Sequence, residues 1–154
     1  IAIAKLDVPV LRRRDDWAMG PAVPDVQAAQ QDISWAQHIV VFYPIWFGTI
    51  PALLKAFFEQ VLRPGFAVGE LVPGKPPGPK LLGGRSARLV VTMGMPSLVF
   101  RCFYSSGLRV MSRNLLGFAG IAPVRSTVVG SVEERGPAHP RWIQKMEEMG
   151  RRGQ

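Results

Sequence analysis

The feature that most constrains this chain is an unbroken apolar run at residues 39–43, followed by a short loop with two aromatic residues. Ile, Val and Phe side chains without a polar interruption are typical of a strand buried on both faces, as in a parallel sheet. Pro44 ends the run, and Trp46, Phe47 and Gly48 follow it. In open α/β sheets, ligands bind beyond the carboxyl ends of the strands. We therefore expect this loop to hold a flat ligand.

Helical patterns flank this segment on both sides. In residues 51–62, apolar side chains recur at helical spacing, at Leu54, Phe57, Phe58, Val61 and Leu62. A weaker stripe of the same kind in residues 25–37 leads directly into the apolar run. Because a helix that feeds an apolar strand is half of a βαβ unit, both patterns predict a parallel sheet.

The rest of the chain continues the alternation of strands and helices. Further strands are predicted at residues 1–7, 88–92 and 123–130. Helices are predicted at residues 97–118, with a break near 105–107, and from Pro140 onward. This order indicates a single α/β domain over residues 1–154, with a doubly wound parallel sheet and helices on both faces.

Residues 64–84 interrupt the pattern because they are rich in proline and glycine. A loop of about 20 residues without its own structure is uncommon in a compact domain. We expect this segment to be either a disordered loop or a functional lid.

Composition favours a globular protein, with 154 residues, 47% hydrophobic and 19% charged. No stretch approaches the roughly 18 consecutive apolar residues of a membrane span. The single cysteine, Cys102, excludes an intramolecular disulfide and fits a reducing compartment, so the expected location is cytoplasmic. Its apolar neighbours predict a buried structural thiol.

The formal net charge of +8 raises the question of a nucleic-acid partner. The basic residues form short groups, and neither zinc-finger spacing nor an aromatic RNA-binding signature accompanies them. We expect no nucleic-acid binding, but a solvated basic surface that could attract anionic small molecules such as dinucleotides. Two isolated histidines and no nucleophilic triad predict neither a metal site nor covalent catalysis.

Spacing alone leaves two interpretations of Trp46 and Phe47. Aromatic side chains dominate protein cores, so both could simply pack inside the domain. Their position on a loop before a glycine favours the alternative, in which a planar ring lies across the loop and backbone N–H groups bind it. Gly48 and Gly94 would allow the backbone to approach such a ligand closely.

Residues 42–62, FYPIWFGTIPALLKAFFEQVL, continued by PGFA at 64–67, resemble the flavodoxin-like NAD(P)H:quinone oxidoreductase family. That family includes DT-diaphorase and related bacterial NAD(P)H-dependent oxidoreductases. Further similarity lies in LVVTMGMP at 89–96 and GFAGI at 117–121. The resemblance implies a flavodoxin-like fold and a homodimer with bound FMN or FAD. NAD(P)H would deliver a hydride to the flavin, and a quinone-like small-molecule acceptor would remove it.

The resemblance also implies positions for the site. The loop that binds the flavin ring corresponds to Pro44, Ile45, Trp46, Phe47 and Gly48. A second flavin loop corresponds to Thr92, Met93, Gly94 and Met95, where backbone N–H groups would stabilise charge on the reduced ring. The acceptor pocket would involve Trp46, Phe66, Val68, Phe100 and Tyr104.

The sequence departs from the family pattern in several places. The similarity begins at the family's second strand, so the first strand, the phosphate loop and the first helix have no counterpart in it. Met95 replaces a common glycine, Phe100 offers no hydroxyl where DT-diaphorase has a tyrosine, and Val68 replaces an aromatic residue. A non-catalytic relative that acts as a regulatory binding subunit is therefore the alternative to an enzyme.

Overall fold

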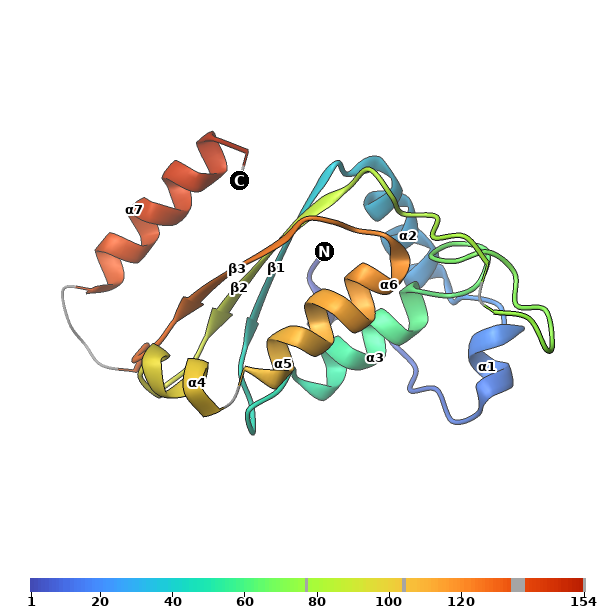
Figure 1. The fold of residues 1–154 in the computed structure, drawn as a ribbon, viewed down its shortest axis with the longest axis horizontal. Coiled ribbons are helices and arrows are strands. Elements are labelled where there is room, and N and C mark those ends of the chain that lie inside the picture. The colour runs from blue at the N-terminus through green and yellow to red at the C-terminus, as the bar shows by residue number, and fades with distance from the viewer. Residues whose placement is uncertain (77, 104, 134–137, 154) are drawn as a thin grey trace.

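A parallel sheet forms the centre of the molecule (Figure 1). The computed structural model describes residues 1–76, 78–103, 105–133 and 138–153. The strands lie side by side in the order β1 (His38–Pro44), β2 (Ser86–Thr92) and β3 (Val124–Val129). Val41 lies opposite Leu89, and Leu89 lies opposite Ser126. The predicted flavodoxin-like parallel sheet is confirmed, and the carboxyl ends of all these strands share one edge.

The predicted strand at residues 1–7 is wrong. Ile3–Lys5 instead forms a short 3₁₀ helix, η1, whose flanking N–H groups bond locally, from Lys5 to the Ala2 oxygen and from Leu6 to the Ile3 oxygen. An alternation of Ile and Ala suits a strand only if a neighbouring strand accepts its hydrogen bonds. Here the local bonds satisfy the backbone without one.

Strand β1 is also less buried than predicted. Within the described residues it pairs with β2 alone, so it lies at the edge of the sheet. Val41 and Tyr43 face the core, whereas the alternate residues Val40 and Phe42 are exposed, Phe42 to 65%. The central strand β2 is the one that is buried on both faces, over Ala87–Val91.

Helices cover the core face of the sheet. They are α2 (Pro24–Trp35), α3 (Ala52–Val61), and the continuous run formed by α5 (Ser106–Arg109), η2 (Val110–Leu116) and α6 (Gly117–Ala119). The predicted stripe on α3 is confirmed, because Leu54, Phe57, Phe58 and Val61 are all buried in the core. Two shorter helices are α1 (Arg14–Ala18) and α4 (Ser97–Phe103). On the opposite side of the sheet from α3 and α5 lies α7 (Ala138–Arg151) (Figure 1).

The proline- and glycine-rich segment at residues 64–84 folds back on the domain where it is described. Val68 is buried, and the N–H groups of Gly69 and Leu81 bond to the oxygens of Pro79 and Ala67. Leu82 N–H bonds to the Ala119 oxygen at the end of α6. Helix α3 begins near the carboxyl ends of the strands and runs back toward their amino ends. The segment that follows it therefore lies near the amino ends of the strands, on the opposite side of the molecule from the loops that follow the strands (Figure 1).

Candidate functional site

The loop after β1 is a tight turn closed by two hydrogen bonds. Trp46 N–H bonds to the Thr49 oxygen and Thr49 N–H bonds to the Trp46 oxygen, each at 3.0 Å. The two central residues, Phe47 and Gly48, have φ angles of 49° and 76°. Positive φ at both central positions defines a type I′ turn, which normally contains Asn or Gly there. A phenylalanine in this conformation is unusual.

Both aromatic side chains of the turn are exposed. Phe47 is fully exposed and Trp46 is 59% exposed, so core packing does not account for either residue. Pro44 is exposed as well, while Ile45 is half-buried and packs against the core. Strained backbone at a bulky residue costs of order 1 kcal/mol and occurs mainly at functional sites. Exposure and strain together single out this turn.

The second predicted loop lies directly beside the first. Ile45 N–H bonds to the Thr92 oxygen at 2.8 Å, which joins the two loops where their strands end. Thr92 and Met95 are half-buried and Gly94 is exposed, but Met93 is buried and its N–H bonds to the Val129 oxygen at 3.0 Å. The Met93 N–H is therefore occupied by the sheet and does not serve as a ligand donor.

What the two loops offer a ligand is a set of main-chain donors. Among the described residues, no acceptor bonds to the N–H groups of Phe47, Gly48, Gly94 or Met95. Carbonyl oxygens and ring nitrogens of a planar heterocycle match such donors without any particular side chain. The exposed rings of Trp46 and Phe47 lie on the same turn, where they can cover a face of the heterocycle.

The loop after β3 belongs to this site and was missed from the sequence. Ser131 N–H bonds to the Met95 oxygen and Val132 N–H bonds to the Met93 oxygen, at 3.1 and 3.2 Å. The Glu133 carboxylate lies against Gly94, because an ideal Cβ on that glycine would be 3.2 Å from Oε1. The signal available in the sequence was that a third parallel strand ends at the same edge.

The residues predicted for an acceptor pocket do not gather here. Phe100 and Val68 are both fully buried, so neither presents a surface to a bound molecule. Phe66 is half-buried and lies with Val68 at the opposite edge of the sheet. Tyr104 lies outside the described residues. Of the predicted acceptor residues, the structure places Trp46 at the candidate site.

The prediction that Cys102 is a buried structural thiol is wrong, because its side chain on α4 is exposed. The short α4 turns its buried face inward at Phe100, which leaves the cysteine toward solvent. Within the described part of the chain, no cluster of His, Cys, Asp or Glu is suited to a metal ion. None of the helices in that same part is long and apolar enough to cross a bilayer.

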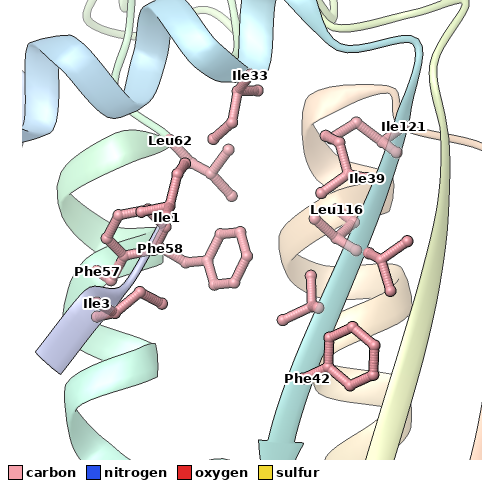
Figure 2. Close-up of a pocket in the computed structure, with 12 residues that line it drawn as sticks. Ile1, Ile3, Ile33, Ile39, Phe42, Phe57, Phe58, Leu62, Leu116 and Ile121 are labelled. Carbon is pink, nitrogen blue, oxygen red and sulfur yellow. The ribbon is translucent and has the colours of Figure 1, made fainter. Parts of the chain in front are cut away.

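An apolar cavity of about 300 Å³ lies elsewhere, between α3, the N-terminal segment and the side of β1 that has no partner strand among the described residues (Figure 2). The residues that line it all have apolar side chains: Ile1, Ile3, Ile33, Ile39, Val40, Val41, Phe42, Phe57, Phe58, Leu62, Leu116 and Ile121. None of these residues belongs to the two loops, so this cavity is separate from the candidate ring site.

Curated relatives match about half of the chain or less. A ribosyldihydronicotinamide dehydrogenase-like protein of Penicillium crustosum is 31% identical over 83 residues, 51% of this chain and 31% of its own length. The potassium-efflux ancillary protein KefG of Erwinia tasmaniensis is 36% identical over 76 residues, 49% of this chain and 38% of its own. NAD(P)H dehydrogenase [quinone] 1 of Rattus norvegicus is 43% identical over 49 residues, which are 31% of this chain and 18% of its own length. The chain thus spans well under half the length of these relatives.

Solved structures show the same fold over more of the chain. Smu.1420 from Streptococcus mutans has a TM-score of 0.73 at 27% identity, and the matched region covers 93% of this chain and 76% of the Smu.1420 chain. General stress protein 14 from Treponema denticola, solved in complex with FMN, has a TM-score of 0.52 at 27% identity. The matched region covers 69% of this chain and 60% of that protein's chain. A model of the flavodoxin-like fold family matches residues 1–151. The chain belongs to the flavodoxin-like fold family.

Proposed function

We propose that this chain binds the ring of a flavin, FMN in the first instance, at the Trp46–Thr49 turn and the Thr92–Met95 loop. The proposed activity is that of an NAD(P)H oxidoreductase with a quinone-like acceptor. The observation that supports it most is the pair of adjacent loops, whose N–H groups without an acceptor among the described residues lie beside a strained turn with two exposed aromatic side chains. The relatives named as quinone and nicotinamide dehydrogenases support the same class of reaction.

The residues fit the ring portion of the cofactor. The N–H groups of Phe47 and Gly48 would hold one polar edge of the ring from the first turn. The N–H groups of Gly94 and Met95 would face it from the second loop. Trp46 and Phe47 would cover the ring and keep water from it. Because the main chain supplies the donors, the site needs few specific side chains.

When bound, a flavin supplies reversible two-electron chemistry between a reduced nicotinamide and a quinone. The task of this chain is to orient the ring and to place fixed donors where negative charge builds up. Such preorganised N–H groups act like an oxyanion hole, because they need no rearrangement as charge develops. With Phe100 and Val68 buried, Trp46 and Phe47 are the side chains we propose to contact the acceptor.

FMN titration of the purified chain tests this proposal. Gly48→Ala is the site variant and Gly74→Ala is its matched control, because both glycines have a φ of 76°. An alanine strains either backbone alike, by roughly 1 kcal/mol, but only Gly48 lies in the ring site. We expect FMN to bind the wild-type chain, Gly48→Ala to weaken binding at least about tenfold, and Gly74→Ala to leave it unchanged.

Flavin fluorescence gives the dissociation constants, and NAD(P)H oxidation with a soluble quinone gives the activity. Equal affinity in both variants would contradict the placement of the ring at the turn. A wild-type chain that takes up neither FMN nor FAD would contradict the proposed function itself. A homodimer is a further proposal, and sedimentation of the chain as a single monomeric species at micromolar concentration would refute it.

Similarity to KefG favours one other candidate, a regulatory binding subunit of a larger assembly. In that case the exposed turn would contact a protein partner rather than an electron acceptor. The two candidates differ in turnover: a regulatory subunit can bind FMN without oxidising NAD(P)H in the presence of a quinone.

A further inference from the structure

The turn that carries Phe47 is backed by a glycine of α5. Gly107 is buried, and an ideal Cβ on it would lie 2.9 Å from the Gly48 oxygen and 3.0 Å from Thr49 Cα. Both neighbours are backbone atoms of the turn, which cannot move aside as the end of a flexible side chain can. The absence of a side chain at residue 107 therefore lets the helix backbone touch the turn directly.

A second glycine stands in the same relation to the other loop. An ideal Cβ on Gly130, just after β3, would lie 2.5 Å from Ser97 N and 2.7 Å from the Met95 oxygen. The neighbouring Ser131 N–H already bonds to that Met95 oxygen at 3.1 Å. The backbone just after β3 is therefore in direct contact with the backbone of residues 95–97, with no space between them for a Cβ atom on Gly130.

We propose that Gly107 and Gly130 are positioning residues that set where the two loops of the ring site lie. This inference rests on the proposed flavin function for its consequence, but not for its geometry. Neither glycine touches the proposed ring, and each acts through the backbone of one loop. Their joint effect is to hold two sets of N–H donors at a fixed separation on one edge of the sheet.

The physical reason lies in how a planar ligand uses two loops at once. A rigid ring can accept hydrogen bonds from both loops only if their separation matches its own width. Displacement of a positioning group by about 1 Å can cost as much as a hundredfold in function. A methyl group at residue 107 or 130 must displace the backbone, because its contacts of 2.9 Å and 2.5 Å are shorter than the 3.0 Å below which real Cβ atoms essentially never approach. The shift is a few tenths of an ångström at residue 107 and larger at residue 130.

The experiment compares Gly107→Ala and Gly130→Ala with Gly150→Ala. Gly150 has no atom within 4 Å of its ideal Cβ, and it lies on α7 away from both loops. Each variant is labelled with ¹⁵N, its amide spectrum is recorded without flavin, and its FMN dissociation constant is then measured. Recording the spectrum without flavin separates the position of the loops from the binding of the cofactor.

We expect Gly107→Ala to shift the amide signals of residues 46–49 and Gly130→Ala to shift those of residues 93–95 and of Ser97. FMN affinity should fall about tenfold or more in both and stay at the wild-type value in Gly150→Ala. Unchanged loop signals with unchanged affinity would overturn the inference. If the wild-type chain binds no flavin, the proposed function fails, while the loop signals alone still decide whether these glycines set the geometry.

A double-mutant cycle covers the case in which Gly107→Ala folds poorly. Phe47→Gly frees the first turn to yield, so it should reduce the stability cost of Gly107→Ala and leave the cost of Gly130→Ala unchanged. Urea unfolding of the wild type, the three single variants and the two double variants measures both costs. An equal cost of Gly107→Ala with and without Phe47→Gly would show that its Cβ does not act on the turn, and would overturn the inference.

Discussion

At the scale of single residues, Phe47 is the most informative position. Its side chain is fully exposed while its backbone has a φ of 49°, so it contributes no packing and adds strain. Such a residue lowers the stability of the chain that contains it. A strained phenylalanine is accounted for if its ring covers a bound ligand. Stability then favours a residue that tolerates positive φ, whereas ligand binding favours the aromatic ring.

Phe47→Asn should separate these demands. Asparagine tolerates the left-handed conformation, so we expect the free energy of unfolding to rise by roughly 0.5–1 kcal/mol. FMN affinity should fall, because an aromatic cover is lost. Urea unfolding without flavin and fluorescence titration with FMN measure the two effects. A less stable variant would show that Phe47 makes a native contact that its exposure does not reveal.

Tyr43 predicts a pH dependence. It is buried, its hydroxyl has no partner among the described residues, and burial raises its pKa above the ordinary value of about 10. The unfolded chain releases this proton as the pH passes about 10, while the folded chain keeps it. The contribution of Tyr43 to stability is thus complete below that pH and declines above it.

Tyr43→Phe should remove this alkaline loss. At neutral pH the variant should be as stable as the wild type or slightly more so, because a buried hydroxyl without a partner is removed. Between about pH 8 and about pH 11 the wild type should lose more stability than the variant. Urea unfolding at both pH values checks the difference, and equal losses would show that the phenol ionises freely in the folded protein.

At the scale of elements, α3 connects the candidate site to the core. The turn at residues 46–49 leads into it after Pro51, and its inner face packs Phe57 and Phe58 edge to face, with ring centroids 5.4 Å apart. The outer face carries Leu53, which is 44% exposed. The helix therefore offers two apolar residues of opposite environment for a matched comparison.

Phe57→Ala should destabilise the fold by about 3–5 kcal/mol, because it leaves a cavity against Phe58 and the sheet. Leu53→Ala on the same helix should change stability by about 0.5 kcal/mol or less. Chemical denaturation monitored by circular dichroism compares them. Equal effects would mean that α3 does not pack on the sheet through the face seen here.

The sequence predicts this element level well and the site only in part. The stripe on α3 is readable because apolar residues recur at helical spacing, and the strands at residues 39–43 and 88–92 are readable because apolar residues follow one another there. The strand predicted at residues 1–7 fails because its backbone found local partners instead of a neighbouring strand. The occupied N–H of Met93 and the positive φ of Phe47 depend on neighbours distant in sequence or on strain that residue type does not indicate.

At the scale of the whole molecule, the β1 side of the sheet combines an unpaired strand edge, among the described residues, with exposed apolar side chains. Within the described residues the outer edge of β1 is unpaired, Val40 and Phe42 are exposed, and the apolar cavity of Figure 2 opens beside them. A long, flat and apolar edge strand is a recognised cause of association between chains.

Phe42→Thr should therefore reduce self-association, because it lowers the apolar surface of this edge and keeps a β-branched residue in the strand. Leu98→Thr is the control, since Leu98 is exposed to 72% but lies on α4. Light scattering at increasing protein concentration and binding of the dye ANS measure both variants. Equal light scattering and equal ANS binding of the two variants would show that the surface responsible for self-association lies away from β1.

The main-chain nature of the ring site has a consequence for how such a protein can diverge. Substitution of the Met95 side chain need not remove the N–H donor of that residue, so the sequence of the loop can change while the site persists. Positions without a side chain cannot drift in the same way, because Gly107 and Gly130 have no space for even a methyl group. In a saturation mutagenesis screen, tolerance should therefore be lower at these two glycines than at Met95, whose N–H group would contact the ligand.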